Sequence, residues 1–199
     1  MAGTDWDVHY QSDNPPWETG RPSEELQRVI AEERVQPCRA IDLGCGTSIN
    51  AIWLAQQGFD VTAVDFSPLA IEKARGRAAA ANATVRFVLS DVLNLPDIFE
   101  AFPFFFDRGC YHAVRRDDVR AYLRTLQQIT APGSIGLVLA GNARDPREPG
   151  KGPPVVSAEE IHAELGSAFE ILQLREFYFD QVEDDGIRFL AWSCLLRRA

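Results

Sequence analysis

The stretch of residues 40–65 limits the possible folds of this chain more than any other feature. Residues 40–43 form an apolar run that is typical of a short buried strand. The turn Gly44-Cys45-Gly46 follows, and its glycines allow the backbone to approach another group closely. Residues 49–57 then show the apolar spacing of a helix. The order predicts a strand, a tight turn and a helix.

A second strand completes this unit. Residues 61–64 are apolar, and Asp65 follows at the carboxyl end of the run. Strand, glycine turn, helix, strand and terminal acid is the order found in the nucleotide-binding half of a doubly wound sheet. A carboxylate fixed at a strand end can accept hydrogen bonds from two ribose hydroxyls. We therefore expect a nucleotide cofactor between the glycine turn and Asp65.

The identity of the nucleotide follows from two positions near the turn. A dinucleotide fingerprint needs a third glycine where this chain has Ile49, which argues against an NAD-dependent oxidoreductase. The chain instead places Asp42 before the turn, and Ile-Asp-Leu-Gly-Cys-Gly resembles the first motif of class I methyltransferases. That resemblance implies S-adenosylmethionine as cofactor and S-adenosylhomocysteine as product. One departure is Ser48, where the family usually has glycine.

The remaining chain alternates strand and helix patterns. The predicted strands cover residues 40–43, 61–64, 85–89, 103–107, 135–140, 169–179 and 187–197, and the predicted helices 23–36, 49–57, 68–81, about 119–129 and 157–165. We expect an α/β fold with a Rossmann-like, doubly wound, mostly parallel seven-stranded sheet, an antiparallel C-terminal hairpin and helices on both faces. Residues 1–22 are predicted as an arm or lid, and residues 23–199 as a single domain.

Composition narrows the class of protein. Apolar content of 46% and charged content of 25% are ordinary for a globular domain. A net charge of −9 argues against a nucleic-acid surface, which needs a basic face. Four scattered cysteines without a C-x-x-C pair favour neither a metal site nor a disulfide framework. With no apolar leader and no membrane-length apolar run, we expect a cytoplasmic protein, as a monomer or weak homodimer.

A closer resemblance spans nearly the whole chain. Residues 106–114, Phe-Asp-Arg-Gly-Cys-Tyr-His-Ala-Val, resemble the Trp-Asp-Arg-Gly segment of thiopurine S-methyltransferases and related thiol methyltransferases. Residues 149–161 resemble the Gly-Pro-Pro segment of that family and its following helix. Residues 16–22 are similar to a Trp-containing stretch of thiol and halide methyltransferases. The chain therefore resembles the thiopurine and thiol methyltransferase superfamily throughout.

The resemblance assigns roles on the cofactor side. It implies that Trp17 packs on the cofactor, that Asp91 and Val92 meet the adenine, and that Arg108 reaches the methionine carboxylate. A guanidinium pairs with a carboxylate through two bonds, which suits Arg108. Purely structural alternatives stay open: Trp17 is then a packing anchor, Asp91 forms a turn, and Arg108 is a solvated loop residue. The predicted cofactor-binding residues are Trp17, Asp42, Gly44, Cys45, Gly46, Asp65, Phe66, Asp91, Val92, Asp107 and Arg108.

The acceptor side has fewer signals. His112 lies just beyond a predicted strand end and is the candidate general base, with a core or wall histidine as the alternative. Tyr111 is a candidate for the acceptor pocket wall, or else belongs to the core. Arg144 and Arg147 lie in a loop rich in Pro, Gly and Arg, where they either attract an anionic acceptor or are simply solvated.

These residues predict a methyltransferase that acts on a small molecule. The resemblance favours a soft acceptor such as a thiol, a thiopurine-like heterocycle, or a selenium, tellurium or halide species. A thiolate needs no strong base, because free thiols titrate near pH ~8.5. The alternatives are an O- or N-methyltransferase of a small metabolite and a cofactor-binding sensor without catalysis.

Overall fold

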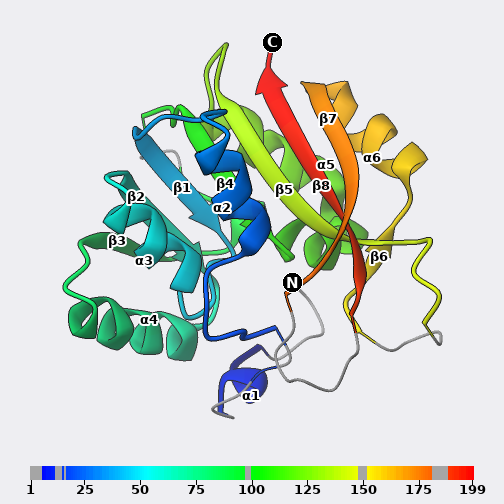
Figure 1. Ribbon diagram of the computed structural model, residues 1–199. Helices are drawn as coiled ribbons and strands as arrows, with labels where there is room; N and C mark the ends of the chain where they lie inside the picture. The colour runs from blue at the N-terminus through cyan, green and yellow to red at the C-terminus, as the bar shows by residue number, and fades with distance from the viewer. Residues whose placement is uncertain (1–5, 12–14, 16, 97–99, 148–151, 181–187) are drawn as a thin grey trace.

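The computed structural model describes residues 6–11, 15, 17–96, 100–147, 152–180 and 188–199. Across these residues, eight strands form one mixed sheet in the order β3-β2-β1-β4-β5-β8-β7, with the short β6 paired to β5 (Figure 1). The strands are β1 (Arg39–Leu43), β2 (Asp60–Asp65), β3 (Val85–Leu89), β4 (Phe104–Arg108), β5 (Ile135–Asn142), β6 (Val155–Val156), β7 (Phe169–Tyr178) and β8 (Leu190–Arg198). β8 is antiparallel to both β5 and β7.

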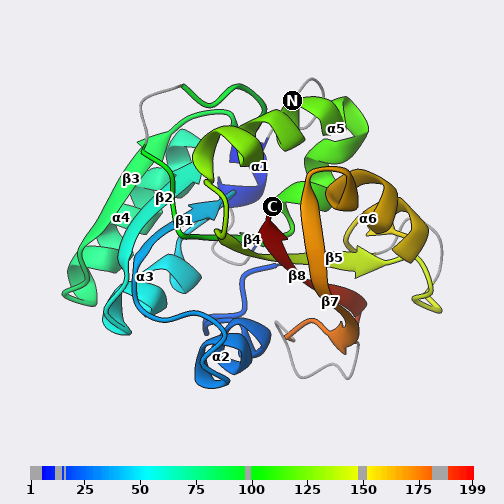
Figure 2. The ribbon, with the colours of Figure 1, turned by 90° about the horizontal axis from the view of Figure 1, so that it is seen from above.

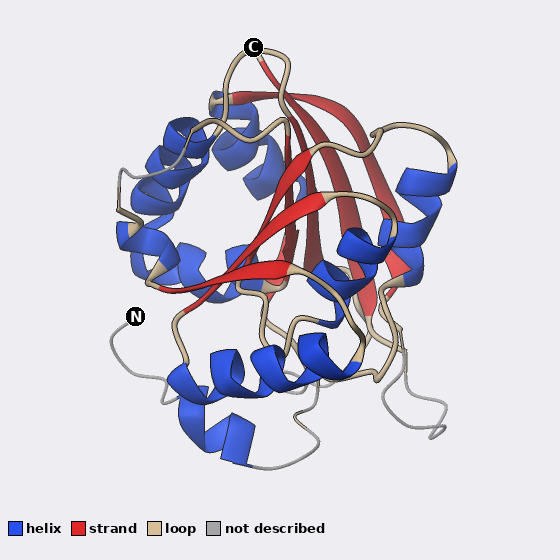
Figure 3. Ribbon diagram, turned by 90° about the vertical axis from the view of Figure 1, so that its left-hand side faces the viewer, coloured by secondary structure: helices blue, strands red, loops and turns tan. Residues whose placement is uncertain are grey.

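Helices cover both faces of this sheet. They are α1 (Trp6–Gln11), α2 (Glu24–Ala31), α3 (Ile49–Gln56), α4 (Pro68–Ala80), α5 (Cys110–Ile129) and α6 (Ala158–Glu164), with 3₁₀ turns η1 (Val92–Asn94) and η2 (Leu165–Ser167). Figure 2 shows α2 and α3 on one side of the sheet and α5 and α6 on the other. Figure 3 shows the strands, in red, between these two sets of helices.

Strand periodicity explains the two layers of core. Successive side chains of a strand point to opposite faces. Phe104 and Phe106 of β4 therefore join the apolar cluster that includes Leu26 of α2 and Leu54 of α3. Phe105 joins the opposite cluster, which α5 and α6 complete. A strand buried on both faces reads as a continuous apolar run, as the three phenylalanines do.

Side-chain caps begin two of the helices where the sequence indicates. The Ser67 hydroxyl accepts a hydrogen bond from the Ala70 N–H (3.0 Å), and Pro68 occupies the first turn of α4. Ser157 and Glu160 form a capping box at the start of α6. These caps fix the points at which the chain leaves the sheet.

The predicted fold class is confirmed, with local differences. The two-residue β6 raises the strand count above the predicted seven. α1 was not predicted, α2 ends at Ala31 rather than residue 36, and α5 begins at Cys110, earlier than expected. Residue 187, the predicted start of the last strand, lies outside the described residues. In the part of the chain that the structure describes, no helix has the length and apolarity needed to cross a bilayer.

Two glycine substitutions test the packing of the central sheet. Gly136 of β5 lies beside Phe105, whose ring would stand 2.0 Å from a Cβ at that position. We expect Gly136→Ala to lower the free energy of unfolding by about 1–3 kcal/mol through overpacking.

The matched control is Gly76→Ala in the exposed part of α4, where a Cβ meets nothing within 4 Å. This change should raise the free energy of unfolding by about 0.5–1 kcal/mol, because glycine weakens helix interiors. Urea denaturation of both variants measures the difference. Equal effects would contradict the described packing at Gly136.

Candidate functional site

A cavity of about 680 Å³ lies at the carboxyl ends of the parallel strands. Its walls come from α1, the segment after it, the glycine turn, the ends of β2 and β4, the start of α5, and the residues before β6, after β7 and before β8. Figure 1 shows α1 beyond the ends to which the parallel strand arrows point. In open α/β sheets this edge is where ligands bind.

The glycine turn is compressed between two neighbours. Gly44 has a φ of +67° and Gly46 a φ of +53°. A Cβ on Gly44 would lie 2.6 Å from the Cys110 Cβ, and one on Gly46 would lie 2.8 Å from the Tyr10 hydroxyl oxygen. The Cys45 N–H donates to the Val64 carbonyl at 2.9 Å, which ties the turn to β2. Only glycine meets both the conformation and the space.

Ser48 keeps the conformation that the expected glycine would have. Its φ of +65° and ψ of 30° lie in the left-handed region, where it precedes α3. A non-glycine residue there costs roughly 1 kcal/mol or more. The sequence departure at Ser48 thus changes the residue but keeps the left-handed backbone.

The Asp65 carboxylate is oriented by backbone donors. Gly46 N–H donates to one oxygen at 2.7 Å, and Ser67 N–H donates to the other at 2.9 Å. Burial raises the pKa of Asp65, and these hydrogen bonds oppose that rise. The carboxylate lines the cavity with a fixed orientation and retains capacity to accept further hydrogen bonds.

Asp42 belongs to the cavity wall and has one carboxylate oxygen without a partner among the described residues. Its side chain is buried, and among the described residues Oδ2 has no hydrogen-bond partner. Burial, followed by the nearby carboxylates of Asp107 and Asp65, raises the pKa of Asp42 to about 8. A buried, unpaired carboxylate is costly. A cationic ligand group would relieve that cost.

Arg108 supplies the opposite charge at the end of β4. Its Nη1 donates to the Trp17 carbonyl at 3.2 Å, and its guanidinium lies 5.2 Å from the centre of the Phe179 ring. Burial lowers its pKa. No carboxylate of the described residues forms an ion pair with Arg108 within 4.0 Å. The guanidinium can therefore take an anionic group of a ligand.

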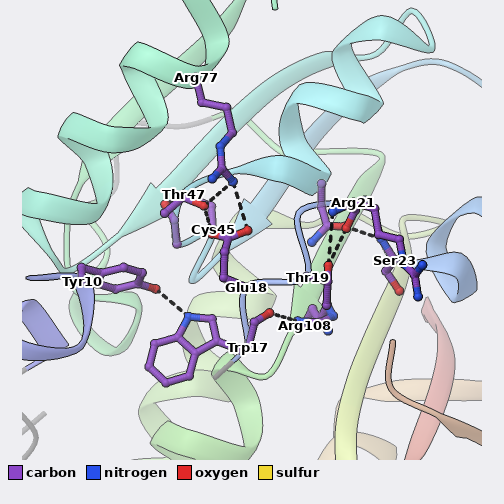
Figure 4. Close-up of polar contacts among 12 residues, drawn as sticks. Tyr10, Trp17, Glu18, Thr19, Arg21, Ser23, Cys45, Thr47, Arg77 and Arg108 are labelled. Carbon is purple, nitrogen blue, oxygen red and sulfur yellow. Dashed lines mark hydrogen bonds and ion pairs between the residues drawn. The ribbon is translucent and has the colours of Figure 1, made fainter. Parts of the chain in front are cut away.

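An aromatic cluster closes one side of the cavity. The rings of Trp6, His9 and Tyr10 of α1 surround Trp17, with centroid distances of 5.6, 5.2 and 5.8 Å. The Trp17 indole N–H donates to the Tyr10 hydroxyl at 3.2 Å (Figure 4). Trp17 is thus both a cavity wall and an anchor for α1.

A polar cluster ties the segment after α1 to the glycine turn. The Glu18 carboxylate accepts hydrogen bonds from the Thr47 hydroxyl and from Arg77 Nη1, the latter at 3.0 Å. Figure 4 shows Arg77 reaching from α4 toward both partners. Reasoning from the sequence missed Glu18, Thr47 and Arg77. The only signal was that Glu18 follows Trp17 in the segment quoted for the resemblance.

His112 lies in the wall at the start of α5. The Gly141 N–H donates to His112 Nδ1 at 2.9 Å. Burial, helped by Arg108, Arg147 and Arg116, lowers the pKa of His112 to about 3. This hydrogen bond occupies the Nδ1 lone pair, and the role of His112 as a general base stays a prediction. A neutral imidazole in this arrangement carries its hydrogen on Nε2.

Two predicted site residues support α5 instead of lining the cavity. Asp107 is buried and accepts hydrogen bonds from the Cys110 and Tyr111 N–H groups and the Tyr122 hydroxyl. The Tyr111 side chain is fully buried, and its hydroxyl donates to Glu164 at 2.7 Å. Neither residue lines the cavity, and their expected contacts with cofactor and acceptor stay predictions.

Some of the other predicted site residues line the cavity, and others do not. Cys45, Phe66 and Val92 line the cavity. Asp91 does not; its carboxylate accepts the Leu93 N–H at 2.9 Å and caps η1. Arg144, predicted for the acceptor, is 76% exposed and pairs with Glu176 at 3.2 Å. The sequence predicted the strand ends correctly, but it did not specify where each side chain points.

Comparison with known proteins decides the family. The thiopurine S-methyltransferase family matches residues 1–194. The chain belongs to this family. The predicted resemblance is therefore confirmed over nearly the full length.

This member of the thiopurine S-methyltransferase family is similar in sequence to several named proteins. The 2-heptyl-1-hydroxyquinolin-4(1H)-one methyltransferase of Mycobacteroides abscessus is 30% identical over 63% of this chain and 55% of its own length. The probable S-adenosyl-L-methionine-dependent methyltransferase TehB of Haemophilus influenzae is 27% identical over 59% of this chain and 41% of its own. The chain thus spans about half the length of these relatives.

Solved structures share the fold. One was determined in work on the conversion of a disulfide bond into a thioacetal group during echinomycin biosynthesis. It has a TM-score of 0.82 and 26% identity, and covers 95% of this chain and 86% of its own. The crystal structure of TehB from Haemophilus influenzae has a TM-score of 0.71 and 21% identity, covering 87% and 62%. The second likeness concerns the fold alone.

We expect Asp42→Asn to stabilise the ligand-free protein, and more so at higher pH. The pKa of Asp42 is raised in the folded state, so the wild type loses stability as the pH rises from its unfolded pKa toward about 8. The amide removes that loss, by about 1 kcal/mol or more at pH 8. Thermal unfolding at pH 5 and pH 8 measures the difference.

The control is Asp60→Asn, at the exposed amino end of β2. Its effect on the melting temperature should be small and the same at both pH values. If Asp42→Asn behaves like this control, the Asp42 carboxylate is not a buried, unpaired group.

Proposed function

We propose that this member of the thiopurine S-methyltransferase family transfers a methyl group from S-adenosylmethionine to a small-molecule acceptor. One observation carries the proposal. A single cavity brings together the compressed turn of Gly44 and Gly46, the oriented carboxylate of Asp65, the unpartnered oxygen of Asp42 and the guanidinium of Arg108. That set matches the mixed charges of the cofactor.

The residues fit the parts of the cofactor one by one. Asp65 suits the ribose hydroxyls, because both of its oxygens are held by backbone N–H groups. Asp42 suits the cationic part and Arg108 the carboxylate. Phe66 and Val92 offer apolar surface to the adenine. The bound cofactor supplies a methyl group activated on a sulfonium.

The protein contributes alignment and exclusion of water. Because the leaving thioether is neutral, no acid is required, and correct positioning of the acceptor provides most of the acceleration. The described parts of residues 1–22 add Trp17 to the wall and hold it through Glu18. In our proposal this segment is a lid over the cavity.

The finer part of the proposal concerns the acceptor. A sulfur or other soft nucleophile is favoured by family membership and by the structural neighbour associated with disulfide-to-thioacetal conversion. An oxygen or nitrogen acceptor is the second candidate, because the Mycobacteroides abscessus relative is named for a hydroxyquinolinone. The aromatic lining by Phe179 and Phe189 suits a planar molecule in either case.

We expect Asp65→Asn to weaken binding of S-adenosylhomocysteine by about tenfold or more, since hydrogen bonds to a charged group contribute about 1.5–3 kcal/mol. Isothermal titration calorimetry measures the change. Asp60→Asn, at the opposite end of the same strand, should bind like the wild type. Unchanged affinity in Asp65→Asn would contradict the ribose assignment.

A panel of acceptors tests the chemistry. Thiols, phenols and amines are incubated with labelled S-adenosylmethionine, and methylated products are detected by mass. We expect aromatic thiols to be methylated fastest. Turnover of only hydroxyl or amine acceptors would overturn the sulfur preference, and tight cofactor binding without any product would favour a sensor.

A further inference from the structure

We propose that His112 is a hydrogen-bond donor that selects methyl acceptors already ionised when they bind. The acceptors are then planar, apolar molecules with an acidic nucleophile, such as aromatic thiolates or heteroaromatic oxyanions. This inference rests on the proposed function and deepens it. It replaces the general base expected at His112 with a specificity-determining donor.

The orientation of the imidazole follows from a backbone contact. A backbone N–H can only donate, so the Gly141 N–H at 2.9 Å makes Nδ1 of His112 the acceptor. A neutral imidazole then has its hydrogen on Nε2. Gly141 is closely packed on its other side, because a Cβ built on it would lie 2.3 Å from the Pro154 carbonyl oxygen. The ring is held by β5 and the segment behind it.

The second nitrogen faces the cavity wall. Nε2 lies 3.2 Å from the position of a Cβ on Gly109, and both residues line the cavity. No hydrogen bond to Nε2 occurs among the described residues, and the protein does not fully enclose this atom. The N–H is therefore available to a ligand.

Positive charge reaches His112 from three elements, although the cavity wall also includes the carboxylates of Glu18, Asp42, Asp65 and Asp180. Arg108 from β4, Arg116 from α5 and Arg147 from the loop after β5 all act on the imidazole electrostatically. The Arg147 guanidinium is largely buried, and among the described residues its Nη1 has no partner. Unlike the exposed Arg144, Arg147 has a buried guanidinium that acts on His112 electrostatically, although it also lies 3.9 Å from the Asp145 carboxylate.

Apolar surface defines the rest of the acceptor. The Phe179 ring meets His112 edge-on, with centroids 6.4 Å apart. Phe189 lines the cavity in front of the Arg147 guanidinium, which lies 5.2 Å from its ring centre. Aromatic walls beside a hydrogen-bond donor and a buried cation suit an aromatic anion.

The chemical balance then needs no base from the protein. The acceptor gives its proton to solvent before it binds. Its lone pair forms the new bond to the methyl carbon while the carbon–sulfur bond of the sulfonium breaks, and that electron pair stays on the neutral thioether. Asp180 is the acidic side chain of the cavity wall that would be the alternative base, but its oxygens accept the Glu24 N–H at 3.3 and 3.4 Å.

Nitrogen NMR tests the donor directly. The chain has three histidines, so ¹⁵N-labelled imidazoles are easily assigned with His112→Phe as the reference. We expect His112 in the ligand-free protein to stay neutral with its hydrogen on Nε2 from pH 5 to pH 8. Titration within that range, or a hydrogen on Nδ1, would overturn the proposal.

A chromophoric acceptor analogue tests selection of the anion. 4-Nitrophenol, whose ionised form absorbs visible light, is titrated with pH in the presence of protein saturated with S-adenosylhomocysteine. We expect the pKa of the bound phenol to fall by about one unit or more, as cations and donors favour the charged form. His112→Phe should lose most of that fall, whereas His162→Phe, on the exposed face of α6, should keep it.

The outcomes separate the two proposals. A protein that does not bind S-adenosylhomocysteine refutes the proposed function. A protein that binds it, yet takes up 4-nitrophenol as the neutral phenol, shows the same shift in His112→Phe, or does not bind the probe, refutes the selection of anions. Loss of the shift in Asp180→Asn with retention in His112→Phe would move the role to Asp180.

Discussion

The hydrogen bond from the Gly46 N–H to the Asp65 carboxylate links the two halves of the site. It joins the turn after β1 to the end of β2, and the left-handed conformations of Gly44 and Gly46 make it possible. Cys110 and Tyr10 close in from either side, so neither glycine has room for a side chain. The position of α1, the start of α5 and the cavity between them all depend on this compression.

Buried carboxylates at and behind the cavity lower the stability of the ligand-free protein. Asp42, Asp65 and Asp107 are buried near one another, and burial raises the pKa of each. Asp107 offsets its burial with hydrogen bonds to α5, whereas one oxygen of Asp42 has no such partner in the described chain. Functional sites commonly retain such unfavourable groups because a ligand compensates them.

Much of the fold could be predicted from the sequence because its signals are local. The strand and helix periods, the glycine turn and the caps at Ser67 and Ser157 each depend on a few adjacent residues. Asp107 and Tyr111 were assigned to the cavity because they follow a strand end, but the direction of a side chain depends on tertiary packing. The contact of Glu18 with Arg77, 59 positions away, has no local signal at all. His112 was found by its position, whereas its tautomer depends on Gly141 in another strand.

The cluster of Glu18, Thr47 and Arg77 bears on how a ligand enters the cavity. The Arg77 side chain is 37% exposed and that of Glu18 only 9%, so this ion pair is partly open to water. Dissolved salt screens the exposed Arg77 end of this contact, whereas the Glu18 end is buried and also accepts the Thr47 hydroxyl. Because Arg108 also holds the Trp17 carbonyl, releasing that segment frees the guanidinium in the same motion. If this segment is the lid that we propose, entry of a ligand and exposure of its anchoring charge are one event.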